Sequence, residues 1–254
     1  MHRQLNYLGV TILLGLLLVA CSASPKVETI SDSETEAIIV EIENELVPKA
    51  ASQEQIVIFE DPSLEKMMRE QIDKPEGDIT PVDMEMVYSI NINYDETPVY
   101  ELDGLEYALN LNDFTYRNGT LKSLDPIGKL KNMGYINISY SKVEAVMQPF
   151  ETPTLSRISF IETSISDFDF LKNVTTFTNV TISRCGISSI AFMKDWLALE
   201  TLNISYNKIS NIEPIMQLKF LKELTVYEDL DNKIIDRGLL ETLVGRGVLV
   251  DYNK

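Results

Sequence analysis

Apolar residues recur at a spacing of 22 residues between Ile92 and Leu243. The seven successive positions at this spacing are Ile92, Phe114, Ile136, Ile158, Val180, Leu202 and Leu224. The positions two residues further on are apolar or aromatic in every unit: Tyr94, Tyr116, Ile138, Phe160, Ile182, Ile204 and Val226. A repeat of this length is typical of a solenoid, in which stacked coils bury a core that one coil alone cannot bury.

Each repeat predicts one short strand followed by a compact return. Two apolar residues on either side of a polar one indicate a half-buried strand, and strands in successive coils stack in parallel. The return from Ile209 to Ile215 is too short for a full α-helix, which favours 3₁₀ turns and extended chain. We therefore predict an α/β solenoid over residues 91–230, with a parallel β-sheet on its concave face.

Several stretches resemble the bacterial internalin-type leucine-rich repeat family. They are the 22-residue unit itself, the return "NKISNIEPI" with Pro214, the matching "LKSLDPI" with Pro126, and the lead-in "LDGLEYALNLND". The resemblance covers about residues 56–254. It implies a protein-binding solenoid flanked by caps, because that family generally recognises a partner on its concave sheet.

The chain departs from the family pattern five residues after each marker, where the family favours Asn. The residues here are Thr97, Gly119, Ser141, Thr163, Cys185, Asn207 and Asp229. A side chain at this bend is needed to bond backbone groups that would otherwise be buried and unpaired. Gly119 cannot do so, and we expect an irregular coil there. Cys185 is expected to be a small structural residue of this row, with a reactive thiol as the alternative.

Helix signals flank the repeats. Asp61-Pro62 and Thr80-Pro81 are typical helix starts, so residues 56–90 are predicted to form an N-terminal cap of two short helices. The Met residues there are interpreted as core, rather than as a cofactor or metal-binding stripe. Leu239, Leu240 and Leu243 at helical spacing, followed by Val248–Val250, predict a helix and strand that close residues 231–254.

The N-terminus resembles a bacterial lipoprotein signal peptide. A short basic start and an apolar run from Leu8 to Ala20 precede Cys21, so residues 1–20 are interpreted as the signal and Cys21 as the lipidated residue. The alternative is an ordinary signal peptide with an incidental Cys21. Residues 21–55 are polar and acidic, which is typical of a flexible tether.

Composition excludes several function classes. The net charge is −17, from 39 acidic and 22 basic residues, which has the wrong sign for nucleic-acid binding or a polybasic grip on lipid. The single histidine is His2, inside the predicted signal, so no His-based catalytic triad or zinc site is available. Phosphate-binding glycine motifs are also missing from the sequence. We expect no cofactor, no metal and no enzymatic activity.

The outward side of the predicted sheet is the candidate binding surface. Small polar residues run along its centre and larger ones flank them, and the first coil is expected to contribute Asn91, Asn93 and Asp95. The candidate partner-binding residues are Tyr135, Asn137, Tyr140, Arg157, Ser159, Arg184, Asn203, Tyr206 and Tyr227. Tyr and Arg are enriched at binding hot spots. The alternative is a solvated sheet face with residues chosen for strand propensity.

These features predict a lipid-anchored monomer on the extracytoplasmic face of a bacterial cell membrane, which binds a protein or peptide on its concave face. A cell-envelope glycan-binding or structural module is the alternative, because rows of Tyr, Asn, Thr and Ser would also suit sugars.

Overall fold

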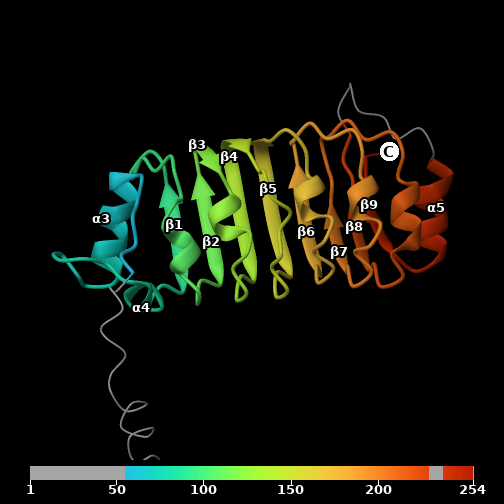
Figure 1. The fold of residues 1–254 in the computed structure, drawn as a ribbon. Coiled ribbons are helices and arrows are strands. Elements are labelled where there is room, and N and C mark those ends of the chain that lie inside the picture. The colour runs from blue at the N-terminus through green and yellow to red at the C-terminus, as the bar shows by residue number, and fades with distance from the viewer. Residues whose placement is uncertain (1–54, 229–236, 254) are drawn as a thin grey trace, which may run out of the picture. The chain divides into compact units, whose positions relative to one another are not determined.

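The structure is a computed structural model that describes residues 55–228 and 237–253. In this described part, nine strands form one parallel sheet (Figure 1). They are β1 (Ser89–Asn93), β2 (Asp113–Arg117), β3 (Thr120–Ser123), β4 (Tyr135–Ala145), β5 (Arg157–Ser164), β6 (Asn179–Ser183), β7 (Thr201–Asn203), β8 (Glu223–Thr225) and β9 (Leu249–Asp251). The strands pair in chain order, except that β3 lies off this path and pairs with the second half of β4.

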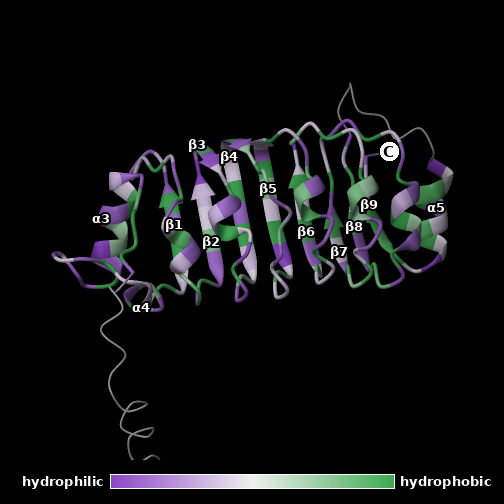
Figure 2. Cartoon of the chain, viewed as in Figure 1, coloured by the Kyte–Doolittle hydropathy of each residue, from purple (hydrophilic) through white to green (hydrophobic). Residues whose placement is uncertain are grey.

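Apolar residues from successive coils lie side by side, as the repeat predicts. Phe114 pairs with Ile136, and the same register continues through the next coils to Leu224 at β8. These residues are all buried. Hydrophobic and hydrophilic residues alternate along the longer strands in Figure 2. The alternation separates a buried core side from a polar side, which we call the open face.

The register predicted for the first coil is wrong by two residues. Ile90 of β1 pairs with Phe114, and Ile92 pairs with Tyr116. The outward residues of β1 are therefore Ser89, Asn91 and Asn93. Because strands have a period of two, a shift by two residues keeps the same faces, and polarity alone could not distinguish the registers. The observed register buries two isoleucines and leaves Tyr94 half-buried beyond the strand.

The returns contain short 3₁₀ helices, as predicted. Within the described residues these are η1 (Leu105–Tyr107), η2 (Asp125–Ile127), η3 (Asp169–Leu171), η4 (Ala191–Met193) and η5 (Glu213–Gln217). Pro126 and Pro214 lie in the first turns of η2 and η5, where a missing backbone N–H leaves no hydrogen bond unmade.

Two helices precede the sheet where the sequence signals predict them. In α3 (Pro62–Gln71), the carboxylate of Asp61 accepts hydrogen bonds from the first backbone amides. Its second oxygen accepts from the amide of Tyr100 at 2.6 Å, which ties the helix to the first coil. In α4 (Pro81–Met84), Thr80 and Asp83 form a capping box. Both helices contribute buried side chains to the core.

A helix and a strand follow the last described coil. Leu240 and Leu243 of α5 (Arg237–Gly245) are buried, which confirms the predicted helical spacing. β9 pairs in parallel with β8 and places Val250 beside Leu224. The predicted strand therefore forms, starting one residue later than expected. Cys21, the predicted tether and Asp229 lie outside the described residues.

Side chains at several of the bends after the strands form the predicted hydrogen-bond ladder. The Asn207 amide donates to the carbonyl of Ile182 in the preceding coil at 2.6 Å, and its oxygen accepts from the amide of Cys185 at 3.0 Å. The Thr163 hydroxyl donates to the carbonyl of Ile138 at 2.8 Å. Each side chain thus pairs backbone groups that the stacked coils remove from water.

Gly119 has no side chain to contribute to the ladder, and the bend there is held by other contacts. The hydroxyl of Tyr116 donates toward the carbonyls of Val99 and Thr120, at 2.9 and 3.0 Å. The ring of Tyr94 fills the space beside Gly119, since a Cβ there would lie 2.4 Å from Tyr94 Cγ. The expectation of an irregular coil is wrong, because β3 begins at the next residue and continues the sheet. The Tyr116 hydroxyl thus pairs other carbonyls near the bend, while the Gly119 amide donates to the hydroxyl of Ser141 at 3.4 Å.

Candidate partner-binding face

The centre of the open face is a row of small polar residues. The row consists of Thr115, Asn137, Ser159, Thr181, Asn203 and Thr225, which lie side by side and are all half-buried. Larger side chains stand beside it, among them Arg157, which is exposed, and Tyr140, which is 58% exposed. The face is therefore low along its centre and higher at its sides, as the sequence predicts.

A second row runs along one edge of the open face, at the bend four residues after each marker position of the repeat. It consists of Asn118, Tyr140, Glu162, Arg184 and Tyr206, and we call it the exit row. All five have a positive φ, between 49° and 65°. The left-handed region is unfavourable for residues with a Cβ, by about 1–2 kcal/mol. Because the conformation recurs in five successive coils, it belongs to the bend of these coils and does not mark a single site.

Tyr135 and Arg157 form one cluster on the opposite side of the central row. The Arg157 guanidinium carbon lies 4.9 Å from the centre of the Tyr135 ring, at cation–π distance. The two residues occupy paired positions on β4 and β5. Within the described residues Arg157 makes no ion pair, so its charge stays available to a partner.

A longer cluster crosses four coils and starts in the exit row. Arg184 lies 3.0 Å from the Glu162 carboxylate and 4.3 Å from the centre of the Tyr206 ring. The Tyr206 ring stacks on that of Tyr227, with centroids 6.0 Å apart. The Tyr227 hydroxyl donates to Asp251 at 2.5 Å, and this hydrogen bond raises the pKa of Tyr227. The cluster is a continuous charged and aromatic surface.

The remaining candidate residues lie apart from these clusters. The Asn203 side chain accepts a hydrogen bond from the amide of Ser205 in its own coil. The side-chain oxygen of Asn137 is buried and has no hydrogen-bond partner in the described structure. Ser159 belongs to the half-buried central row. Tyr140 stands alone in the exit row, with neither a cation nor a ring stacked on it among the described residues.

A polar hollow of about 560 Å³ opens beside Tyr140, and we call it the exit-row hollow. Its lining residues are Tyr94, Asn118, Gly119, Thr120, Tyr140, Ser141, Lys142 and Glu162. Asn118 is held in place by hydrogen bonds from its amide to Asn93 and Asp95, at 3.0 and 3.1 Å. The hollow thus has tyrosine rings, amide and hydroxyl groups, and one carboxylate that faces the same space.

Solved structures that resemble this fold include internalins. The chain matches internalin C2 of Listeria monocytogenes with a TM-score of 0.55 and 18% sequence identity, over 77% of this chain and 95% of that one. It matches a second internalin of that organism, inlF, with a TM-score of 0.61 and 16% identity, over 78% of this chain and 65% of that one. The fold is that of an internalin-type leucine-rich repeat solenoid. Models of protein families and curated proteins give no match to the chain.

Sequence reasoning missed Glu162 and Asp251. These two residues form the two ends of the longer cluster on the open face. Glu162 could have been found, because it stands 22 residues before Arg184 in the same row and carries the opposite charge. Asp251 could not, because the segment between β8 and β9 does not follow the repeat.

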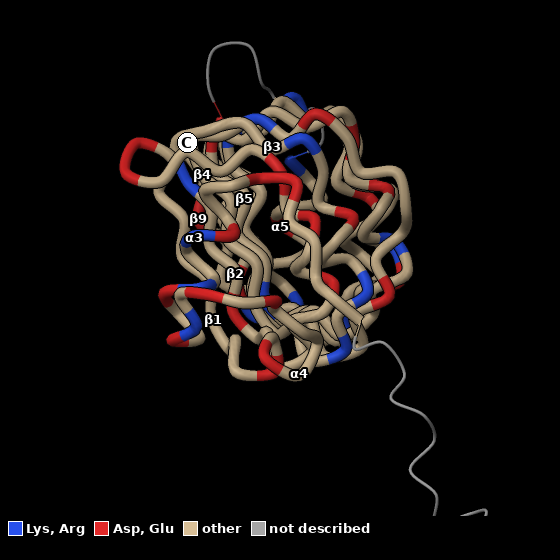
Figure 3. The backbone as a smooth tube through the Cα atoms, turned by 60° about the vertical axis from the view of Figure 1, so that its left-hand side comes forward, with Lys and Arg blue, Asp and Glu red and all other residues tan. Residues whose placement is uncertain are grey.

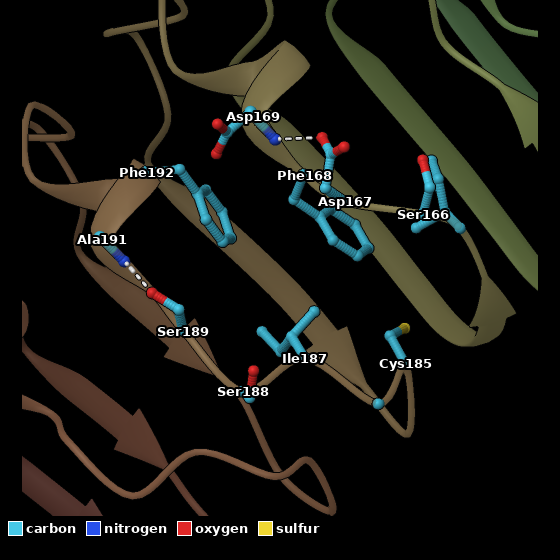
Figure 4. Close-up of a pocket in the computed structure, with 12 residues that line it drawn as sticks. Ser166, Asp167, Phe168, Asp169, Cys185, Ile187, Ser188, Ser189, Ala191 and Phe192 are labelled. Carbon is cyan, nitrogen blue, oxygen red and sulfur yellow. Dashed lines mark hydrogen bonds between the residues drawn. The ribbon is translucent and has the colours of Figure 1, made fainter.

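A smaller pocket of about 230 Å³ lies between two returns of the solenoid (Figure 4). Phe168 and Phe192 face each other in it with ring centroids 5.9 Å apart, and Cys185 lies at its edge. Burial raises the pKa of the Cys185 thiol to about 11, so the thiolate is scarce at neutral pH. The thiol donates to the carbonyl of Phe160, which supports the structural interpretation of Cys185 over the reactive one.

Charged residues are distributed over the solenoid with both signs interspersed in Figure 3. Among the described residues, no group of His, Cys, Asp and Glu is arranged to hold a metal ion. No helix in the same part of the chain is long and apolar enough to cross a membrane.

Proposed function

We propose that this protein is a surface-displayed binding solenoid, which holds a protein or peptide partner on its open face. The proposal rests mainly on one observation: two clusters of Arg and Tyr, around Arg157 and Arg184, flank a low row of small polar residues. Arg and Tyr dominate the energetics of protein interfaces because they combine a large contact area with directed polar groups.

The side chains of the longer cluster are also pre-organised for binding. Arg184 is held between Glu162 and Tyr206, and Tyr206 is held by Tyr227, so less side-chain freedom is lost when a partner docks. The internalin-like fold supports the same function, since a sheet of stacked coils offers an extended surface to a partner.

We further propose that diacyl modification of Cys21 anchors the protein to the outer face of a bacterial cell membrane, with residues 21–55 as spacer. Two acyl chains give the stable anchoring that one chain does not. The net charge of −17 is consistent with a body that is repelled from anionic lipid.

A cell-envelope glycan is the second candidate ligand. The row of Thr, Ser and Asn and the exposed ring of Tyr140 would offer hydrogen bonds and a stacking surface to a sugar. We favour a protein partner because the residues that are locked into clusters include Arg157 and Arg184, which suit charged protein groups better than neutral sugars.

The test is capture of envelope components on the immobilised solenoid, with crosslinking. A Tyr140→Ala/Arg157→Ala/Tyr206→Ala variant should lose a protein partner that the unmodified solenoid retains. The matched control is Lys172→Ala/Lys194→Ala/Leu197→Ala, which alters exposed residues in or next to the returns and should retain it. Retention of polysaccharide alone would favour the glycan candidate, and equal capture by both variants would contradict the open-face assignment.

A further inference from the structure

The solenoid already contains two sites that hold a guanidinium group on its open face. Arg157 lies over Tyr135, and Arg184 lies between the ring of Tyr206 and the carboxylate of Glu162. In the second site a ring supplies cation–π attraction and a carboxylate supplies the opposite charge. The same two groups recur on the other side of Glu162, where none of the arginines in the described residues is bound.

Tyr140 is the ring of that vacant arrangement. It occupies the exit-row position one coil before Glu162, and its side chain is 58% exposed. Both residues line the exit-row hollow. One oxygen of the Glu162 carboxylate binds Arg184, while the other accepts no hydrogen bond from the described residues. An incoming cation could therefore contact the Tyr140 ring and the second carboxylate oxygen together.

The charges around the hollow favour a cation over an anion. Its one basic lining residue, Lys142, is already paired with Glu144 at 3.0 Å. Asp95, which holds Asn118 at the rim, adds a second negative charge. An anionic ligand would meet Glu162 and Asp95 without an unpaired cation, which would cost free energy.

We propose that the exit-row hollow receives an arginine or lysine side chain from a basic segment of the protein partner. The inference deepens the proposed function and rests on it. A volume of about 560 Å³ lies within the usual range of ligand pockets, about 300–1,000 Å³, so a long side chain has room. The net charge of −17 would also speed the approach of a basic segment.

The direct test uses a blocked peptide, Ser-Arg-Ser, and the same peptide with citrulline, which has the shape of arginine without its charge. Binding to the purified solenoid at physiological salt is followed by NMR titration. We expect the citrulline peptide to bind about tenfold more weakly. Glu162→Gln and Tyr140→Leu should each weaken the arginine peptide by a similar factor, whereas Tyr140→Phe should bind within about twofold of wild type, since it keeps the ring.

Glu223→Gln is the matched control, because it removes one negative charge from an exposed residue of the open face that does not line the hollow. It should change binding by less than about twofold at this salt concentration. Equal weakening by Glu223→Gln and Glu162→Gln would overturn the inference, because attraction would then be non-specific. Undetectable binding of the arginine peptide would overturn it as well.

Two further outcomes separate the inference from the function on which it rests. If a soluble chitin oligosaccharide binds and Tyr140→Leu abolishes this binding while the arginine peptide is not retained, the hollow is a sugar site. If Arg157→Ala/Tyr206→Ala abolishes capture of a protein partner and Tyr140→Leu does not, the open face binds protein but the hollow does not take part.

Discussion

Replacing Gly119 by Asn tests how the coils of this solenoid are held together. Asn is the residue that the family pattern favours at this bend, and Asn207 shows that it forms ladder hydrogen bonds in this chain. Consensus reasoning alone would therefore expect Gly119→Asn to stabilise the protein. The structure predicts the opposite, because the space for a side chain is occupied.

The expected destabilisation follows from the contacts at this position. A Cβ on residue 119 would lie 2.4 Å from the Tyr116 hydroxyl and 2.4 Å from Cγ of Tyr94, which is the base of the ring and cannot swing aside. Overpacking of this kind costs about 1–3 kcal/mol. Displacement of the Tyr116 hydroxyl from its carbonyl acceptors adds about 1 kcal/mol. A new ladder bond and a less flexible unfolded chain offset about 1–2 kcal/mol of this total.

We therefore expect Gly119→Asn to lower the free energy of unfolding by about 1.5 kcal/mol, and by no more than about 3 kcal/mol. For a domain of this size the melting temperature should fall by roughly 2–4 °C for each kcal/mol. Urea denaturation measures the change, and Gly245→Ala is the control, because a Cβ at the end of α5 meets no atom within 4 Å. The double variant Tyr94→Ala/Gly119→Asn should lose less than the sum of the single variants. An increase in stability for Gly119→Asn alone would refute this account of the bend.

Four other changes have defined outcomes. Asn207→Ala should lower the free energy of unfolding by about 3 kcal/mol in urea denaturation, because it leaves the carbonyl of Ile182 and other buried backbone groups unpaired. The hydrogen bond from Lys74 is the main reason why the pKa of Asp83 falls to about 2, so the charged carboxylate stabilises the fold above pH 3.8. This stabilisation, about 1 kcal/mol after screening by solvent, should disappear as the pH falls from 3.8 to about 2. It should be missing in Asp83→Asn when unfolding is followed against pH. Cys185 should react with a thiol reagent at neutral pH much more slowly than a free cysteine does, because burial raises its pKa to about 11 and leaves little thiolate, and fast labelling of the folded protein would contradict its structural role. Cys21→Ser should release the protein from the membrane fraction and abolish incorporation of labelled fatty acid, whereas an unchanged membrane fraction would contradict lipid anchoring.

The sequence was sufficient for the fold because the relevant information is periodic. Spacing by 22 residues correctly placed Phe114, Ile136 and the later markers side by side, and local capping signals at Asp61 and Thr80 correctly placed two helices. It failed in the first coil, where Ile90, Ile92 and Tyr94 alternate with polar residues and fit two registers equally well. Only packing against the neighbouring coil distinguishes the two.

The candidate site was predictable as a face but not as a set of contacts. Outward positions on the strands follow from the strand period, so Tyr135 and Arg157 were placed correctly on one surface, and Arg184 and Tyr206 were placed at the exits of their strands. Which of these residues contact one another depends on the direction of each side chain at the bend. It also depends on partners such as Asp251, whose position in the sequence relative to Tyr227 is set by a segment outside the repeat. The exit-row hollow depends on the tyrosine that fills the space of a missing side chain, and no periodic signal predicts it.

The ladder and the open face are coupled through the register of the coils. Arg184 touches Glu162 and Tyr206 because those residues lie 22 positions before and after it, and Arg157 touches Tyr135 for the same reason. Ladder residues such as Asn207 and Thr163 hold neighbouring coils in this register from the opposite side of each bend. A one-residue insertion in any of these coils would therefore have two effects at once. It would break a ladder hydrogen bond, and it would separate two paired residues of the open face. Substitutions within the rows would leave the stack intact, so the binding chemistry of the open face can change row by row while the fold that displays it stays the same.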